Sequence, residues 1–409
     1  MNKGLLQQLL DGRLSFKDLE NLTDASSAKE IRNQFLSKQT GMQLANLGSI
    51  NFDADVVRNR NIENLIGSVE VPVGVAGPVR VKGQAAAGEY FLPMATTEGA
   101  LVASTSRGVK LINLNGGAKV SHNYVGITRA PMFRLESVSE HEAVRVWIKK
   151  QLPKLNKLAT SSSAHLKLKN ITPYFLGREL WLRMQFDTDE AMGMNMATKA
   201  SRIIAEKFTH DFSTAKLVAL SGNLCTDKKA SLLNLIMGRG HQVYAEVTLS
   251  RSDVEKYLHT TPEAITAVNV EKVWHGSGLA GSNSFNSHFA NVIAAIFLAT
   301  GQDMAHVVDS SQGYTVMEVD DGDLYASVSI PSLILGYIGG GTCLPKQAQA
   351  KELILTDVSA KKRTNSARKS SILAEITAAA VLAGEISLHA ALAADELVSA
   401  HEKLGKGRK

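Results

Sequence analysis

The chain has 409 residues, of which 44% are hydrophobic and 21% are charged. These fractions are close to those of ordinary globular proteins, so they exclude an intrinsically disordered chain, a collagen-like chain and a charge-rich coiled coil. The formal net charge of +6 is small for this length and suits an anionic small ligand as well as nucleic acid. The chain has only two cysteines, Cys225 and Cys343. This number excludes a disulfide framework and favours a reducing compartment.

The first 50 residues predict a short helical arm. Residues 5–12 (LLQQLLDG) form an amphipathic stretch that ends in the turn-forming pair Asp-Gly. Residues 15–22 (SFKDLENL) begin with a serine, which can cap a helix, and continue with an acidic first turn. The N-terminus lacks the continuous apolar region and the small-residue cleavage site of a secretory signal. From the amphipathic helices we expect an arm used for packing or for dimer exchange. From the lack of a secretory signal we expect a cytoplasmic protein.

The next segments alternate in character. Residues 69–83 (VEVPVGVAGPVRVKG) predict a strand broken by Pro and Gly turns, and residues 96–113 have the length of a helix. Between residues 130 and 219, strand-like stretches at 132–139 and 179–188 alternate with amphipathic helices at 140–152 and 195–208. From residue 220 onward small residues, glycines and apolar helices return.

We expect an α+β fold with three parts. A large mixed domain, formed by residues 51–129 and 220–409 and containing a buried central helix, is interrupted by a small ferredoxin-like α/β domain at 130–219. The helical arm at 1–50 precedes both. The longest apolar stretch, 289–300 (FANVIAAIFLAT), is shorter than the roughly 18 residues of a membrane helix, so we expect no membrane span.

Glu98 is the first candidate for chemistry. It lies in residues 94–108 (MATTEGALVASTSRG), between threonines and small apolar residues. A carboxyl group there is expected to be shielded from water, as a general acid often is. The alternative is a structural role, in which Thr96 or Thr97 caps the helix and Glu98 lies in its first turn.

A loop with three consecutive charges, Asp227, Lys228 and Lys229, lies in residues 221–230 (SGNLCTDKKA). Neighbouring lysines point to different sides, so one could bind a substrate carboxylate while the other contacts a carbonyl oxygen. A lysine beside a developing oxyanion stabilises charge that exists only in the transition state. The alternative is a solvated turn.

The Gly/Ser-rich residues 276–288 lead into the apolar stretch 289–300, and Asp303 follows. A carboxylate at the end of a buried helix needs a partner or a proton, and a lysine is the natural partner. His288 and Asn291 share one helical face. The alternative for Asp303 is a purely structural buried salt bridge.

Two further stretches are candidates. Five residues open a helix whose free N–H groups could hold a phosphate or diphosphate, namely Met192, Gly193, Met194, Asn195 and Met196. The alternative is a Met-rich core contact. His401 lies near the C-terminus, where a mobile imidazole could protonate a leaving group, although an ordinary exposed histidine is the alternative.

Several ligand classes have no motif. No GxGxxG follows a strand and no GxxxxGK[ST] occurs, so the common nucleotide-binding motifs are absent from the sequence. No HExxH or CxxC occurs and the eleven histidines do not cluster at ligand spacing, so we expect no metal. Two basic clusters, within residues 361–369 and 403–409, lack interleaved aromatic side chains. We therefore expect no nucleic-acid partner.

Seven blocks together resemble the 3-hydroxy-3-methylglutaryl-CoA (HMG-CoA) reductase family, in the form shared by eukaryotes, archaea and some bacteria. They follow the family order over residues 60–401: ENLIGSVEVPVGVAGPV (63–79), MATTEGALVASTSRG (94–108), AMGMNM (191–196), SGNLCTDKKA (221–230), GQDMAHVVDSS (301–311), GGGT (339–342) and AGEISLHAALAADELVSAH (383–401). The membrane-anchoring half of animal members is not in this chain.

The resemblance implies a reduction of HMG-CoA to mevalonate and CoA with two NADPH, and NADH is the alternative coenzyme. The positions that match catalytic residues are Glu98, Lys228, Asp303 and His401. The positions that we assign to the substrate are Ser104, Arg107, Arg129, Ser221, Asp227, Lys229, Lys272, His288 and Asn291. The positions that we assign to the coenzyme are Ser163, Glu190, Met192, Gly193, Met194, Asn195, Met196 and Arg239. The first block matches a dimer contact, which implies a homodimer or larger oligomer with sites between subunits.

The chain departs from the family pattern at two places. Glu190 stands where an aspartate is usual, and Ala164 follows Ser163 where the family often has an arginine for the extra phosphate of NADPH. Lys167 or Lys169 could replace that arginine, so the coenzyme preference stays open. The alternatives in function are oxidative degradation of mevalonate, another CoA-dependent oxidoreductase, and a non-enzymatic binding protein.

Overall fold

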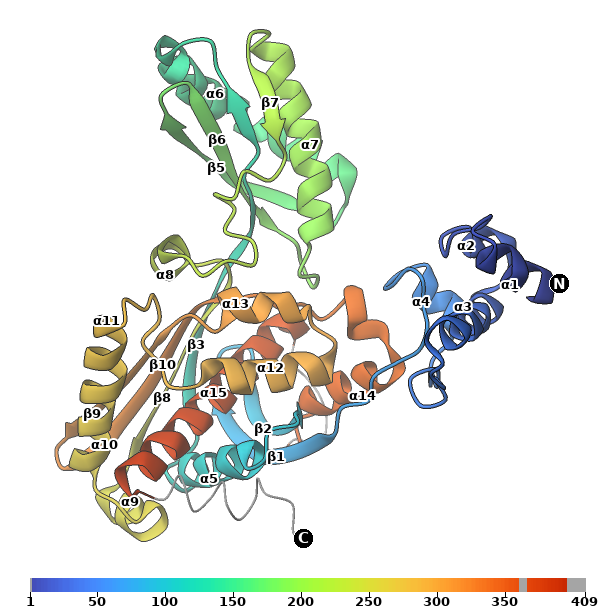
Figure 1. Ribbon diagram of the computed structural model, residues 1–409. Coiled ribbons are helices and arrows are strands. Elements are labelled where there is room, and N and C mark those ends of the chain that lie inside the picture. The colour runs from blue at the N-terminus through green and yellow to red at the C-terminus, as the bar shows by residue number, and fades with distance from the viewer. Residues whose placement is uncertain (1, 360–365, 396–409) are drawn as a thin grey trace.

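One connected sheet runs through the protein and joins its two larger parts. The computed structural model describes residues 2–359 and 366–395, and in them ten strands follow the order β7-β4-β6-β3-β8-β10-β9, with β1, β2 and β5 paired alongside. β3 (Ala118–Arg129) belongs to both parts, because it pairs with β8 (Gly240–Leu249) over most of its length and with β6 (Glu179–Asp187) at its end. Figure 1 shows the large part below, the small part above and a helical arm to one side. The expected mixture of helices and strands is confirmed.

The large part contains most of the sheet and the longest helix. Besides β3 and β8, its strands are β1 (Val73–Lys82), β2 (Ala87–Ala95), β9 (Tyr314–Asp320) and β10 (Asp323–Leu333). Its helices are α5 (Leu101–Leu114), α8 (Leu232–Met237), α9 (Arg251–Leu258), α10 (Pro262–Val268), α11 (Ser277–Leu279), α12 (Phe289–Thr300), α13 (Val307–Ser310), α14 (Pro345–Ile354) and α15 (Lys369–Ala393). A π-helical stretch, Asn269–Gly276, joins α10 to α11.

α15 is the central helix of the large part. The sequence predicted a buried helix at 289–300, and α12 is indeed mostly buried, but 21 of the 25 residues of α15 are buried as well. Its two buried glutamates are bonded: Glu375 accepts the N–H groups of Ala85 and Ala86, and Glu385 those of Ser287 and His288. Among the described helices, α15 has the length and hydropathy of a membrane span, but 83% of that window lies inside the protein.

The small part has the element order β-α-β-β-α-β. It consists of β4 (Met132–Arg134), α6 (His141–Ser162), β5 (Lys167–Leu176), β6, α7 (Met194–Asp211) and β7 (Lys216–Ala219). The strands lie in the order β7-β4-β6-β5 and all pair antiparallel. The strand predicted over 132–139 is wrong in its second half, because Ser137 and Glu140 form a capping box that begins the helical segment leading into α6.

The arm predicted over residues 1–50 is helical between residues 2 and 40, and a further short helix, α4 (Ala54–Arg58), lies beyond its predicted end. The helices of the arm are α1 (Asn2–Leu10), α2 (Leu19–Leu22) and α3 (Ala25–Thr40). α1 ends directly before Asp11 and Gly12, and Gly12 has the positive φ that favours glycine. The helix expected from Ser15 begins only at Leu19, because Ser15 donates its N–H and its hydroxyl to Asp18 and so forms a turn.

The contact between α5 and α15 depends on a glycine. A Cβ atom on Gly108 would lie 1.9 Å from the carbonyl oxygen of Ala383. Gly108→Ala should therefore force the two helices apart and destabilise the fold by about 1–3 kcal/mol, as overpacking of a core usually does. The apparent midpoint of thermal unfolding measures this effect. The matched control is Gly4→Ala, since that helical glycine has no neighbour within 4 Å of the added atom. An equal midpoint in both variants would contradict the prediction.

Candidate active site

Lys228 and Asp303 form an ion pair on the wall of a large cavity. Lys228 follows β7 in the loop 221–230, and Asp303 follows the end of α12. The Lys228 Nζ atom lies 2.8 Å from Asp303 Oδ2, and the two side chains are 42% and 38% exposed. The lysine partner expected for Asp303 is thus present, in a pair that is open to the cavity and not buried.

Backbone contacts fix both members of this pair. Lys228 has a φ of 56°, a value unusual for a residue other than glycine, and its N–H group donates to Asp309. Asp303 accepts the N–H group of Ala305. Partial burial alone would raise the pKa of Asp303, but the hydrogen bond from Lys228, the N–H group of Ala305 and the nearby charge of His306 hold that pKa below its usual value.

A fully buried guanidinium lies behind the pair. Arg239 donates to Asp309 at 2.7 Å, to Asp227 at 3.0 Å and to the hydroxyl of Thr128 at 3.0 Å. Asp227, Asp309 and the imidazole of His306 offer ligand atoms within 4.8 Å of one another. Because Arg239 bridges the two carboxylates, the positive charge of this cluster comes from a side chain, and we assign no metal to it.

Arg129 continues the cluster towards the cavity. Its guanidinium donates to Ser221 at 3.1 Å and to Thr198 at 2.9 Å, and it forms an ion pair with Asp227 at 3.4 Å. Lys229 is exposed and donates to the carbonyl oxygen of Asp227. Four residues assigned to the substrate therefore lie beside Lys228: Arg129, Ser221, Asp227 and Lys229.

A cavity of about 800 Å³ is lined by residues of both the large and the small part. Its walls include Asp303, Lys228, residues 191–196 and the glycines 339–341. α7 begins here after Gly193, and no side chain caps it, so its first N–H groups are available to an anion. Gly339 and Gly340 have open space where a Cβ would lie, so the backbone itself forms that wall. This uncapped helix end and glycine wall fit the diphosphate of a dinucleotide coenzyme.

The other coenzyme candidates are bonded within the protein. Glu190 accepts the N–H groups of Lys369 and Ser370 and so caps α15, and Arg239 has no exposed side-chain surface. The geometry thus does not support a direct contact of either charged group with a coenzyme. Ser163 donates to the sulfur of Met196 at 3.5 Å, which places it beside the start of α7.

The remaining predicted residues lie near the start of α12. Glu98 accepts two hydrogen bonds from Asn291, at 3.0 and 3.2 Å, and it is exposed. The expectation that Glu98 is shielded from water is therefore wrong for the single chain. No hydrogen bond from Thr96 or Thr97 caps α5 either, since its N-cap is Ala100, although Thr96 accepts the N–H group of Glu98.

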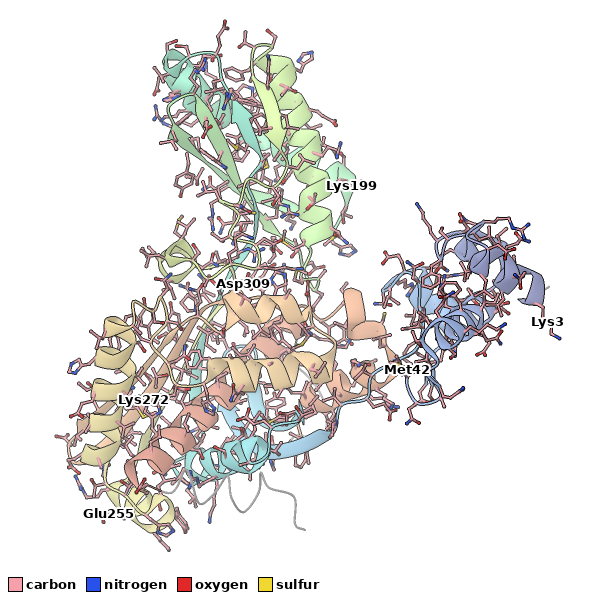
Figure 2. All side chains as sticks on the ribbon, in the orientation of Figure 1. Lys3, Met42, Lys199, Glu255, Lys272 and Asp309 are labelled. Carbon is pink, nitrogen blue, oxygen red and sulfur yellow. The ribbon has the colours of Figure 1, made fainter. Side chains whose placement is uncertain are left out.

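The rest of this second group surrounds the same end of the helix. Ser104 and Arg107 bind Ser387 of α15, and Lys272 donates to Ser287 at 2.9 Å. His288 lies 3.9 Å from Glu385. Figure 2 shows Lys272 on the flank of the large part, well away from Asp309.

The two groups lie at opposite ends of α12. At 1.5 Å per residue, the nine steps from Asn291 to Thr300 separate them by about 14 Å along the helix axis. One chain therefore does not bring Glu98 to Lys228 and Asp303. His401 lies outside the described residues.

Sequence reasoning missed three residues near the cavity. His306 and Asp309 stand three residues apart in the block 301–311, and that spacing was a usable signal of a paired site. Asn61 donates to the carbonyl oxygen of Gly340 and lines the cavity from the segment after the arm. Nothing in the local sequence marks Asn61.

Comparisons with known proteins agree on one family. A model of the hydroxymethylglutaryl-coenzyme A reductase family matches residues 28–406. The chain is 47% identical over 408 residues to the 3-hydroxy-3-methylglutaryl-coenzyme A reductase of Aeropyrum pernix, covering 98% of this chain and 96% of that protein. It is 45% identical over 402 residues to the protein of that name from Haloferax volcanii, covering 98% of each.

Solved structures agree on the fold. A class II 3-hydroxy-3-methylglutaryl-CoA reductase from Streptococcus pneumoniae, described as bound to NADPH in open conformations, aligns with a TM-score of 0.65. The alignment covers 93% of this chain and all of that one at 19% identity. At this identity the match supports the fold alone.

The two ion pairs of the site should differ in their effect on stability. Arg239→Met leaves two carboxylates without their buried partner and should cost about 3–5 kcal/mol. Asp303→Asn breaks a half-exposed pair and should cost no more than about 1 kcal/mol. Thermal unfolding of both variants against the wild type measures the contrast.

The contribution of the Lys228–Asp303 ion pair to stability should depend on pH in one direction. Because the folded protein lowers the pKa of Asp303, its contribution is complete above the unfolded-state value of about 3.9 and is lost as the pH falls through the lower folded value. A large loss of stability for Asp303→Asn at neutral pH would contradict this assignment.

Proposed function

This chain belongs to the hydroxymethylglutaryl-coenzyme A reductase family, and on that premise we propose that it reduces HMG-CoA to mevalonate and CoA with two NADPH. One observation carries the proposal: the ammonium of Lys228, paired with Asp303, lines the same cavity as the uncapped start of α7. That arrangement suits a charged donor beside a substrate carbonyl and a coenzyme phosphate within one cavity.

The small part, residues 130–219, is the proposed coenzyme domain. A bound nicotinamide coenzyme supplies a hydride to each carbonyl carbon. The N–H groups of Asn195 and Met196, in the first turn of α7, would hold its diphosphate. Lys169 donates to the carbonyl oxygens of Tyr124 and Val125, so the exposed Lys167 is the better candidate for the extra phosphate of NADPH.

Lys228 has the central role in the proposed chemistry. Its ammonium would stabilise the negative oxygen that forms when each hydride reaches a carbonyl carbon. Asp303, whose pKa is held below its usual value, pairs with Lys228 and orients its ammonium. Arg129 and Lys229 would bind the free carboxylate of the hydroxymethylglutaryl group, and the carboxylate of Asp227 can accept a hydrogen bond from its hydroxyl.

Two proton donors complete the proposal. Glu98 would protonate the aldehyde oxygen in the second reduction, and His401 would protonate the departing CoA thiolate. The thiolate would otherwise add back to the aldehyde. Ser104 and Arg107, held by Ser387, would lie on the CoA side of the site.

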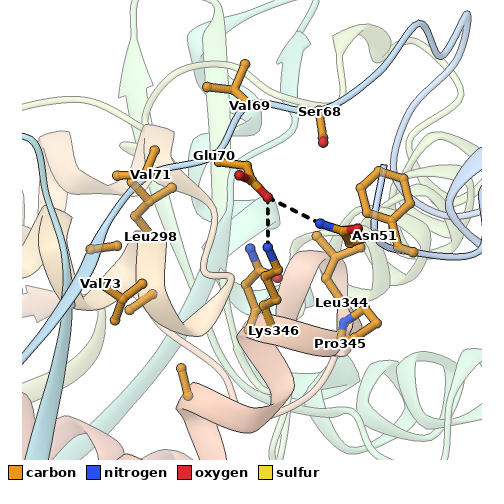
Figure 3. Close-up of a pocket in the computed structure, with 15 residues that line it drawn as sticks. Asn51, Ser68, Val69, Glu70, Val71, Val73, Leu298, Leu344, Pro345 and Lys346 are labelled. Atoms are coloured by element: carbon orange, nitrogen blue, oxygen red, sulfur yellow. Dashed lines mark hydrogen bonds and ion pairs between the residues drawn. The ribbon is translucent and has the colours of Figure 1, made fainter. Parts of the chain in front are cut away.

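A homodimer with shared sites would resolve the separation along α12. A second copy related by a two-fold axis can present its Glu98 to Lys228 of the first, and the reverse. The segment 63–79 supplies a suitable surface, since Val69, Val73 and Val75 are 79%, 58% and 55% exposed. Figure 3 shows the pocket beside this surface, where Glu70 accepts from Lys346 and Asn51. We propose a cytoplasmic protein without a nucleic-acid or membrane partner.

Loss of NADPH absorbance with HMG-CoA tests the reaction. The wild type should consume two NADPH for each mevalonate formed, and the same assay with NADH gives the coenzyme preference. Lys228→Ala should abolish reduction of both the thioester and mevaldehyde, because both steps form an oxyanion. Lys119→Ala is the matched control, since that lysine is exposed on β3. Wild-type protein that oxidises no coenzyme with HMG-CoA would overturn the proposed function.

Mixing two inactive variants tests the shared site. Glu98→Gln and Lys228→Ala should each be inactive alone. When the two variants associate at random, half of the dimers contain one chain of each variant. If Glu98 and Lys228 of one site come from different subunits, one of the two sites in such a dimer is intact. Co-expression should therefore restore up to about a quarter of wild-type activity. No activity in a mixture shown to contain mixed dimers would mean that each site lies within one subunit.

A further inference from the structure

His306 is a fully buried imidazole with one free nitrogen at the site. It lies in the short turn Met304–His306 between Asp303 and α13, and its side chain has no exposed surface. Its Nδ1 atom lies 3.1 and 3.2 Å from the two oxygens of Asp309. Its Nε2 atom has no hydrogen-bond partner among the described residues. A buried polar atom without a partner is costly, so its position calls for an explanation.

The network around Asp309 determines which nitrogen carries the hydrogen. Asp309 Oδ2 forms an ion pair with Arg239 at 2.7 Å and accepts the N–H group of Lys228 at 3.2 Å. A carboxylate only accepts hydrogen bonds, and therefore Nδ1 donates to it. This bond fixes the ring and directs Nε2 towards the catalytic side.

The Nε2 atom faces the two carboxylates that flank Lys228. It lies 3.9 Å from Asp303 Oδ2 and 3.8 Å from Asp227 Oδ1, slightly beyond hydrogen-bond distance. The charged groups around the imidazole are Asp227, Asp303 and Asp309, with Lys228, Arg129 and Arg239 as their partners.

We propose that His306 is a positioning residue for the reduction, whose imidazolium keeps Nδ1–H on Asp309 and donates Nε2–H to Asp303 when Lys228 turns to the substrate oxygen. A negative oxygen beside Lys228 draws the ammonium away from its partner, and Asp303 then needs a second donor. A movement of under 1 Å brings Nε2 to hydrogen-bond distance of Asp303. In its protonated form the imidazole donates from both nitrogens. This inference rests on the proposed function.

Two amide substitutions separate the two nitrogens. In His306→Asn the amide can reach Asp309, as Nδ1 does, but not Asp303. In His306→Gln the longer side chain can place an amide near the position of Nε2. We expect His306→Asn to lower kcat at least tenfold for both reductions, and His306→Gln to lower it less than threefold. KM for either substrate should change less than twofold, because His306 contacts neither.

The pH profile gives a readout that a packing role would not change. Both variants remove a positive charge that helps to lower the pKa of Asp303. That pKa should rise, so the acid limb of kcat should move to higher pH in both. If His306→Asn does not fold, as judged by thermal unfolding, the profile of His306→Gln decides alone.

The outcomes distinguish this inference from the proposed function. If the wild type is active and both variants match it in kcat and in the acid limb of the pH profile, the positioning role of His306 is overturned and the proposed function stands. Equal losses in both variants with a raised KM and an unchanged acid limb would show a packing role and would overturn it too. Wild type that oxidises no NADPH with HMG-CoA overturns the proposed function and this inference together.

Discussion

The candidate site depends on one buried guanidinium. Arg239 binds Thr128 of β3, Asp227 of the loop 221–230 and Asp309 of α13, and so it ties three separate segments to one point. Asp309 in turn holds the N–H group of Lys228 and the imidazole of His306. The buried ion pair of Arg239 and Asp309 therefore fixes the position of Lys228. This pair is shielded from water, and electrostatic interactions are strong in such surroundings. The half-exposed ion pair of Lys228 and Asp303 can then open during a reaction without loss of the fold.

The second constraint is the length of α12. The helix is rigid and mostly buried, and it holds Asn291 near one end and Asp303 beyond the other. No rotation of a side chain can cross that distance, so the residues that the family resemblance implies for one reaction form two half-sites in one chain. Each half is well defined by its own hydrogen bonds before any partner arrives, so assembly would need little reorganisation.

The sequence predicted what local pattern and charge can determine. It identified the helical arm, most of β6 and α7, and a lysine as the partner of Asp303. It did not identify α15 as the central helix, because serine, threonine, glutamate and histidine residues interrupt its apolar sequence, and the buried glutamates are satisfied by partners from distant segments. The exposure of Glu98 was also missed, since shielding by tertiary structure cannot be inferred from small neighbours alone. Glu190 looked like a coenzyme residue, yet its carboxylate caps a helix that begins almost 180 residues later.

That cap joins the two parts of the protein through a backbone. Glu190 holds the first N–H groups of α15, and Asp187 binds Arg368 just before it. Seventeen residues further along, Ser387 holds Ser104 and Arg107, about 25 Å away at 1.5 Å per residue. The same helix thus holds, at its two ends, parts of both half-sites that one chain contributes. A shift of the whole helix along its axis would displace both half-sites of a chain together, and in the proposed dimer it would therefore disturb two active sites and not one.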